Sequence, residues 1–137
     1  MINIYTFNIL FKQVCISCKL LQACKHDIQS TALELLELGN IDYNYVDKNG
    51  DTALIWACTN EMESIALKLL EKEYINYNHL NNDKQTALLE ACNNNMIHVA
   101  LKLVNKYDIN YNQVDSYGYT ALILACKNNV NIIVYES

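Results

Sequence analysis

A period of 34 residues is the feature that most restricts how this chain can fold. Three near-copies of one heptapeptide occur, TALIWAC from Thr52, TALLEAC from Thr86 and TALILAC from Thr120. Each copy begins 34 residues after the previous one, since 86 minus 52 and 120 minus 86 both equal 34. A fixed period of about 20 to 50 residues is typical of proteins that stack equivalent structural units. We therefore expect a solenoid in which each unit contacts its neighbours.

The period continues outside the heptapeptide and defines four units. A diverged first copy precedes the three clear ones, and its leucine, alanine and cysteine are Leu20, Ala23 and Cys24. We expect units at about residues 14–47, 48–81, 82–115 and, incompletely, 116–137. Residues 1–13 are expected to form an irregular capping segment over the first unit. The second helix of the last unit is incomplete, so we expect it to fray or to associate with a second copy, through Val130, Ile133 and Val134.

Each unit carries the patterns of two helices. In the second unit, the hydroxyl of Thr52 can cap the amides that follow, and Leu54, Ala57 and Cys58 have the i, i+3, i+4 spacing of one helical face. The segment ESIALKLLEKEY repeats this spacing over a longer stretch. Polar turns separate the helices, and extended stretches with Gly or Asn turn signals join the units. The fold class predicted is all-α, with helix-turn-helix units and extended, hairpin-like loops.

These units resemble the ankyrin repeat, whose first helix opens with the motif T-P-L-H-x-A. Thr52, Leu54 and Ala57 match the motif, as do the equivalent residues of the two later units. The resemblance covers nearly all of residues 14–137. It implies a non-catalytic module that binds a protein partner on a concave face, which the loop tips and the short first helices form together.

The chain departs from the family pattern at two positions in each of the three clear units and at a loop glycine in one of them. In the second unit, Ala53 replaces the proline and Ile55 replaces the histidine. We therefore expect a less preorganised helix start and the absence of the polar links that this histidine usually makes between neighbouring loops. Lys84 occupies the position that Gly50 and Gly118 hold in the other loops. A left-handed backbone would strain a lysine by about 1 kcal/mol. We therefore expect the loop of the third unit to be the most distorted.

Residues that differ between the units are the candidates for partner binding. They lie at the loop tips and on the outer side of the short helices, and they are Lys48, Asp51, Trp56, Asn60, Gln85, Glu90, Asn94, Tyr117, Tyr119, Leu124 and Lys127. Trp56 has two open interpretations. Tryptophan often dominates the energy of an interface, but this one could equally cover the seam between the first and second units.

The cysteines offer a competing hypothesis. Cys15, Cys18, Cys24 and His26 read C-x2-C-x5-C-x-H, which could hold zinc or carry out redox chemistry. We disfavour this, because Cys24 belongs to a column of small packing residues that also contains Cys58, Cys92 and Cys126. A single C-x2-C pair also lacks the second pair of most zinc sites. We expect no catalytic residue, no cofactor and no metal.

Composition argues against two classes of partner, nucleic acid and membrane. The net charge is −5 and all ten basic residues are lysines, so nucleic acid is not expected to bind. No apolar run reaches the roughly 18 residues that cross a bilayer, and high apolar content fits reduced thiols in the cytoplasm. The Lys, Asn, Ile and Tyr bias is typical of AT-rich genomes, including those of protists and large DNA viruses. The alternative function is a structural, decoy or self-associating scaffold without a specific ligand, and a fragment of a longer array would look the same.

Overall fold

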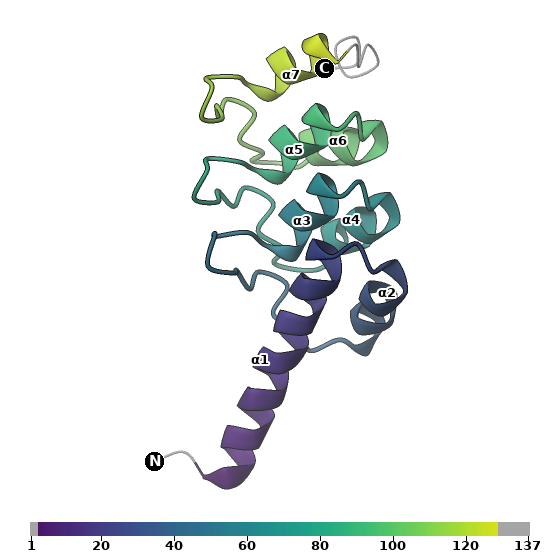
Figure 1. Ribbon diagram of the computed structural model, residues 1–137, viewed down its shortest axis with the longest axis vertical. Coiled ribbons are helices and arrows are strands. Elements are labelled where there is room, and N and C mark those ends of the chain that lie inside the picture. The colour runs from purple at the N-terminus through teal and green to yellow at the C-terminus, as the bar shows by residue number, and fades with distance from the viewer. Residues whose placement is uncertain (1–2, 129–137) are drawn as a thin grey trace.

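The computed structural model describes residues 3–128, and within them it describes no side chains for residues 10–15. The described residues form seven α-helices arranged as stacked pairs (Figure 1). The inner column contains α1 (Ile4–Lys25), α3 (Ala53–Thr59), α5 (Ala87–Asn93) and α7 (Ala121–Lys127). The outer column contains α2 (Gln29–Leu38), α4 (Glu63–Leu70) and α6 (Ile97–Val104). The all-α prediction is confirmed. The expected fraying or pairing at residues 129–137, including Val130, Ile133 and Val134, lies outside the described residues.

Threonine caps start the three short inner helices, as the sequence predicted. The Oγ1 atoms of Thr52 and Thr86 each accept a hydrogen bond at 3.2 Å from the amide three residues later. Thr120 makes the same bond at 3.3 Å. Such a cap satisfies one of the amides that a helix start leaves unpaired. The helices therefore begin at Ala53, Ala87 and Ala121 without the proline of the family motif.

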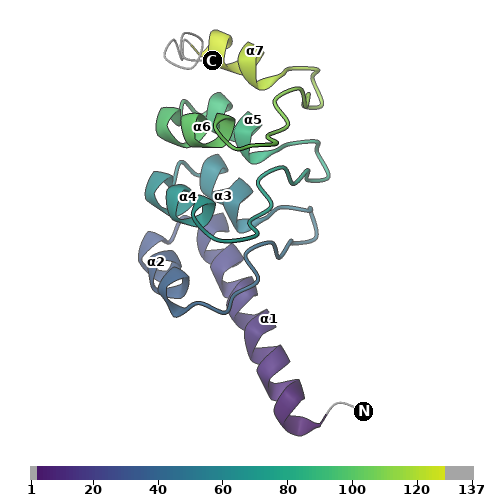
Figure 2. The same ribbon diagram turned by 180° about the vertical axis from the view of Figure 1, so that it is seen from behind.

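The first inner helix is much longer than its equivalents, so the expectation of an irregular N-terminal segment is wrong. Cys18 stands where the other units carry the capping threonine, and the helix continues through it to Ile4. Asn3 provides the N-cap instead, with its Oδ1 accepting from the Thr6 amide at 2.8 Å. The early part of α1 projects away from the stacked units (Figures 1 and 2). The expected boundary between residues 13 and 14 falls inside this helix, and the capping role stays a prediction.

Stacking of the two helical columns builds one continuous core. Inner helices pack against inner helices and outer against outer, and each unit also packs its own pair together. Leu54 and Cys58 of the second unit are at most 1% exposed, as are Leu88 and Cys92 of the third. The predicted cysteine column is confirmed for Cys24, Cys58 and Cys92, whereas Cys126 in the last described helix is exposed.

Repeated side-chain hydrogen bonds tie the outer parts of neighbouring units together. Lys72 donates to the Leu36 carbonyl at 3.2 Å and Lys106 to the Leu70 carbonyl at 3.0 Å, one period apart. These carbonyls lie near the ends of the preceding outer helices, where no intrahelical donor remains. Lys72 also lies over the ring of Tyr43, at 5.2 Å from its centroid. The lysine stems thus cover the seam while their charges satisfy the helix ends.

Candidate functional site: the loop tips and inner helices

One side-chain oxygen fixes the turn at each loop tip. Asp47, Asn81 and Asp115 are equivalent, and the Oδ1 of each accepts two backbone amides, from the residues two and four positions later. All six distances lie between 2.8 and 3.0 Å. Side chains of Asp and Asn commonly stabilise turns in this way. This residue was not among those predicted from the sequence, although an Asp or Asn at this position every 34 residues was a usable signal.

Lys84 adopts the conformation expected of it, but the distortion expected of its loop is absent. Its φ is +62°, against +76° for Gly50 and +82° for Gly118. The Lys84 amide donates to the Asn81 carbonyl at 3.1 Å, close to the 3.0 Å of the equivalent bond in the other two loops. The turn holds its shape because the Asn81 side chain supplies the same two hydrogen bonds. The local strain is therefore stored in one residue without deforming the loop.

Polar links that do not involve the motif's histidine position join the neighbouring loops. His79 Nε2 lies 2.7 Å from the Gly50 carbonyl oxygen, and Asn81 Nδ2 donates to Asp51 Oδ1 at 2.6 Å. The Asn82 amide donates to the Asn49 carbonyl at 3.0 Å. A Cβ on Gly50 would lie only 2.9 Å from Asn82 Oδ1, so the loops approach closely here. The family's histidine is replaced, but other polar residues perform the linking.

Asparagines at the ends of the inner helices connect neighbouring units. Each donates from Nδ2 to two carbonyls at the end of the preceding inner helix, and these residues are Asn60, Asn94 and Asn128. The shortest of these bonds, from Asn60 to the Cys24 carbonyl, measures 2.7 Å. Two of the candidates for partner binding, Asn60 and Asn94, are thus already engaged in the stack.

Trp56 is half-buried and has partners on two sides. Its indole Nε1 donates to Asp47 Oδ2 at 3.0 Å, and Lys25 Nζ lies 5.8 Å from the ring centroid. Burial acts to raise the pKa of Asp47, but hydrogen bonds from Trp56 and two backbone amides, with the Lys25 charge, outweigh it and lower that pKa. Trp56 therefore spans from its own loop to α1 of the first unit, and both interpretations of its role stay open.

Two other candidates are less accessible than expected. Asp51 is 8% exposed and Leu124 is 5% exposed, so their predicted position on an open surface is wrong. Burial raises the pKa of Asp51, against a lowering by the hydrogen bond from Asn81. Glu90 is half-buried, and burial is also the main cause that raises its pKa, with Asp51 and Asp115 adding to it. The middle of the predicted face is thus acidic and largely packed.

The C-terminal part of the predicted face contains an open hollow of about 380 Å³. Five of the predicted residues line it, and these are Gln85, Tyr117, Tyr119, Leu124 and Lys127. Asn93 and Asp115 complete the lining. The rings of Tyr117 and Tyr119 stack with centroids 6.3 Å apart, and Lys127 Nζ lies 4.0 Å from the Tyr119 centroid. Tyr117 is 81% exposed, which makes it available to another molecule.

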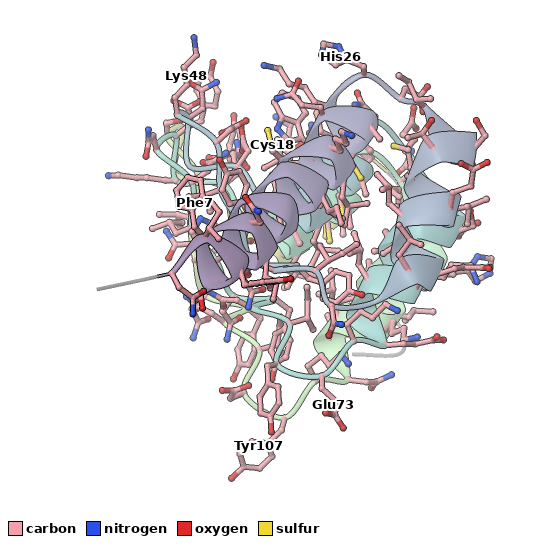
Figure 3. All side chains as sticks on the ribbon, turned by 90° about the horizontal axis from the view of Figure 1, so that it is seen from below. Phe7, Cys18, His26, Lys48, Glu73 and Tyr107 are labelled. Atoms are coloured by element: carbon pink, nitrogen blue, oxygen red, sulfur yellow. The ribbon has the colours of Figure 1, made fainter. Side chains whose placement is uncertain are left out.

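The exposed loop tip of the second unit, which carries Lys48, lies two units before the loop at residues 115–119 that lines this hollow. Lys48 is exposed at that tip, and Figure 3 shows it on the opposite side of the molecule from Glu73 and Tyr107. Of the eleven predicted residues, the structure thus brings five together, leaves Lys48 at a separate tip, and engages the others in the stack. Partner binding by any of them stays a prediction.

The N-terminal cysteine pattern lies along one helix. The exposure of these residues differs, because Cys24 is buried, Cys18 is half-buried and His26 is exposed. His26 Nε2 lies 3.2 Å from Gln22 Oε1. Burial raises the pKa of the Cys24 thiol to about 12, which disfavours the thiolate that binds metal. Among the described side chains, which exclude that of Cys15, no group of three His, Cys, Asp or Glu residues could hold a metal ion. Within residues 3–128, no helix combines the length and hydropathy needed to cross a bilayer.

Comparison with protein families gives a match over the C-terminal part of the chain. A family model described as ankyrin repeats (3 copies) matches residues 74–135. A search of curated proteins found none that matches the chain. The matched residues begin at the loop after α4 and include the whole of the hollow around Tyr117 and Lys127.

Proposed function

We propose that the chain is a non-catalytic module that binds a protein partner on its concave face, because residues 74–135 match the model of ankyrin repeats. Ankyrin repeats are generally protein–protein interaction modules. The observation that carries the finer proposal is the hollow between two neighbouring loops and α7, where residues of both loops converge. Exposed tyrosines are enriched at protein interfaces because they combine apolar area with a polar group. Free, mostly buried cysteines fit a reducing compartment such as the cytoplasm.

Site-specific photo-crosslinking tests the proposed face. A photoreactive amino acid is placed at Tyr117 in one variant and at Tyr107 in another, and each chain is used to capture partners from a lysate. Tyr107 is the matched control, because it is fully exposed but lies outside the hollow. We expect a discrete cross-linked protein from position 117 and none from position 107. Equal cross-linking from both positions would contradict a partner bound on the concave face.

A second candidate function, self-association, rests on the exposed face of α7. Leu122 is 54% exposed and Ile123 41%, whereas the equivalent Leu88 and Leu89 are 1% exposed beneath the next unit. Such a face is suited to cover by another stacked surface. Sedimentation of the chain across a hundredfold concentration range tests this. Concentration-dependent dimerisation that Leu122→Lys abolishes would support a scaffold role, and a monomer at all concentrations would contradict it.

A further inference from the structure

Comparison of equivalent positions within the chain shows that the hollow near Tyr117 corresponds to a place that Trp56 fills in the second unit. Asp115 lies two periods after Asp47, since 115 minus 47 is 68, and Leu124 lies two periods after Trp56. In the second unit, the indole donates to Asp47 Oδ2 at 3.0 Å. In the last described unit, the smaller Leu124 has no donor to offer.

The second carboxylate oxygen of Asp115 is left without a partner from the described part of the chain. Its Oδ1 accepts the Tyr117 and Tyr119 amides at 2.9 Å each, as the Oδ1 of Asp47 does for its own loop. No hydrogen bond reaches Oδ2 from any described residue. No described side-chain oxygen is both buried and unpaired, so Oδ2 keeps access to solvent, and the hollow is the open space that Asp115 lines. Asp115 as a whole is only 6% exposed.

The walls of the hollow suit a flat ring better than their equivalents do. Tyr117 and Tyr119 replace Asn49 and Asp51 of the second unit, and their rings stack at an interplanar angle of 29°. Lys127 supplies an ammonium group within reach, as Lys25 does for Trp56 at 5.8 Å. Offset aromatic packing and a cation over a ring each favour an aromatic guest. A guest that also carries an N–H group could satisfy Asp115.

We propose that the hollow formed by Asp115, Tyr117, Tyr119, Leu124 and Lys127 binds a tryptophan side chain of the protein partner, with its indole N–H donated to Asp115 Oδ2. The partner's indole thereby takes the place that Trp56 takes toward Asp47. This inference rests on the proposed function, because it names the chemical group that the concave face recognises. Tryptophan is also among the residues that most often anchor an interface.

Titration with N-acetyl-tryptophanamide, followed by amide NMR spectra of the ¹⁵N-labelled chain, tests the proposal. The amides of Tyr117 and Tyr119 are the reporters, because both donate to the carboxylate that would receive the indole. We expect saturable shifts at these amides in the millimolar range, since one side chain supplies little binding energy. The 1-methylindole derivative, which lacks the N–H group, should bind at least about tenfold more weakly because it loses a hydrogen bond to a charged acceptor. Equal binding of both probes, or no saturable shift at these amides, would overturn the proposal.

Asp115→Asn is a variant for which the chain supplies its own control. Asn81 shows that an asparagine at this position keeps both turn-forming bonds, through its Oδ1. Asp115→Asn should therefore leave the melting temperature unchanged and lower the affinity for N-acetyl-tryptophanamide about tenfold. If that variant fails to fold, Trp56→Leu provides an independent test. It opens the equivalent place beside Asp47 and should create a second site for the probe there, weaker than the first because Asn49 and Asp51 replace the two tyrosines. Retained binding in a folded Asp115→Asn variant would contradict the role of Oδ2.

Two further comparisons separate this proposal from others. N-acetyl-argininamide offers a flat hydrogen-bond donor that is charged and not aromatic. Stronger binding of this probe than of the indole probe would overturn the choice of tryptophan. Cross-linking of a partner at position 117 without any indole binding would leave the concave-face proposal standing and reject the tryptophan proposal alone. Loss of cross-linking at position 117 together with retained indole binding would instead reject the proposed function.

Discussion

Lys84 holds a backbone conformation that glycine holds in the equivalent loops. Its φ of +62° costs a lysine about 1 kcal/mol, while Gly118 at +82° has no heavy atom within 4 Å of where a Cβ would lie. The two positions form a matched pair. Lys84→Gly should raise the free energy of unfolding by about 0.5 kcal/mol, after the greater flexibility of glycine in the unfolded chain is counted. Gly118→Lys should lower it by a similar amount.

Urea unfolding monitored by circular dichroism measures both changes. The pair is informative because the signs are opposite and the loops share one hydrogen-bond pattern. A destabilised Lys84→Gly variant would mean that the lysine side chain makes a stabilising contact that outweighs its backbone strain.

The hydrogen bond from Trp56 to Asp47 makes stability depend on pH. The folded pKa of Asp47 is lowered, so its contribution is present above the unfolded pKa of about 3.9 and is lost as pH falls through the folded pKa. Trp56→Phe keeps the ring but removes the donor. It should cost about 0.5 kcal/mol at pH 7, a small value because solvent screens this carboxylate. The difference from the unmodified chain should shrink below about pH 4.

Thermal melts of both chains between pH 7 and pH 3 test this coupling. Asp47→Asn supplies the control, because an asparagine at this position keeps the loop turn, as Asn81 shows, but has no charge to lose. In that background, the effect of Trp56→Phe should not change with pH. A difference that grows on acidification would contradict the assignment.

At the scale of the element, an asparagine at the C-terminal end of each short inner helix donates hydrogen bonds to the C-terminal end of the preceding inner helix. Asn94 Nδ2 donates to the carbonyls of Cys58 at 2.9 Å and Thr59 at 3.4 Å, both in the last turn of α3. Asn94→Ala should lower the free energy of unfolding by about 1 kcal/mol, because those carbonyls lose their donor. Asn93→Ala is the matched control, since this exposed neighbour makes no side-chain hydrogen bond within the described residues. Equal effects of the two substitutions in urea unfolding would contradict the capping role.

The sequence predicted those features that depend on a single unit. Threonine caps and the left-handed backbone at Lys84 follow from local rules about helix starts and turns, and both are present. Contacts between units were harder to predict, because a period gives the position of a residue but not its neighbours. Asp51 thus varies between units like a surface residue, yet it is buried against Asn81 of the next loop.

In the candidate site too, some residues could be predicted from the sequence and others could not. Tyr117 and Lys127 were predicted from their variation and do line the hollow, whereas Leu124 forms its floor at 5% exposure. Asp115 was not predicted, because the candidates were residues that differ between the units and Asp115 repeats Asp47. Its two oxygens have different environments, and only the structure distinguishes them. The length of α1 was not predicted either, since Cys18 stands in place of a capping threonine and the sequence around it carries no signal for where the helix begins.

At the scale of the whole molecule, the column of cysteines places one thiol in each stacked unit. Cys24, Cys58 and Cys92 are buried, Cys18 is part-exposed and Cys126 is exposed. Burial raises the pKa of all three buried thiols, with that of Cys92 reaching about 12. Because each unit of a solenoid contacts only its neighbours, units open locally with their own free energies. Thiol labelling therefore measures opening unit by unit.

We expect Cys126 and Cys18 to react with a maleimide within minutes under native conditions, and the buried thiols to react at least about a hundredfold more slowly. Cys58 and Cys92 should be the slowest, because α3 lies between α1 and α5, and α5 lies between α3 and α7. Mass spectrometry of peptides after timed labelling assigns each rate, and labelling in urea provides the unfolded reference. If Cys58 reacted natively as fast as Cys126, the second unit would not be the stable centre of the stack.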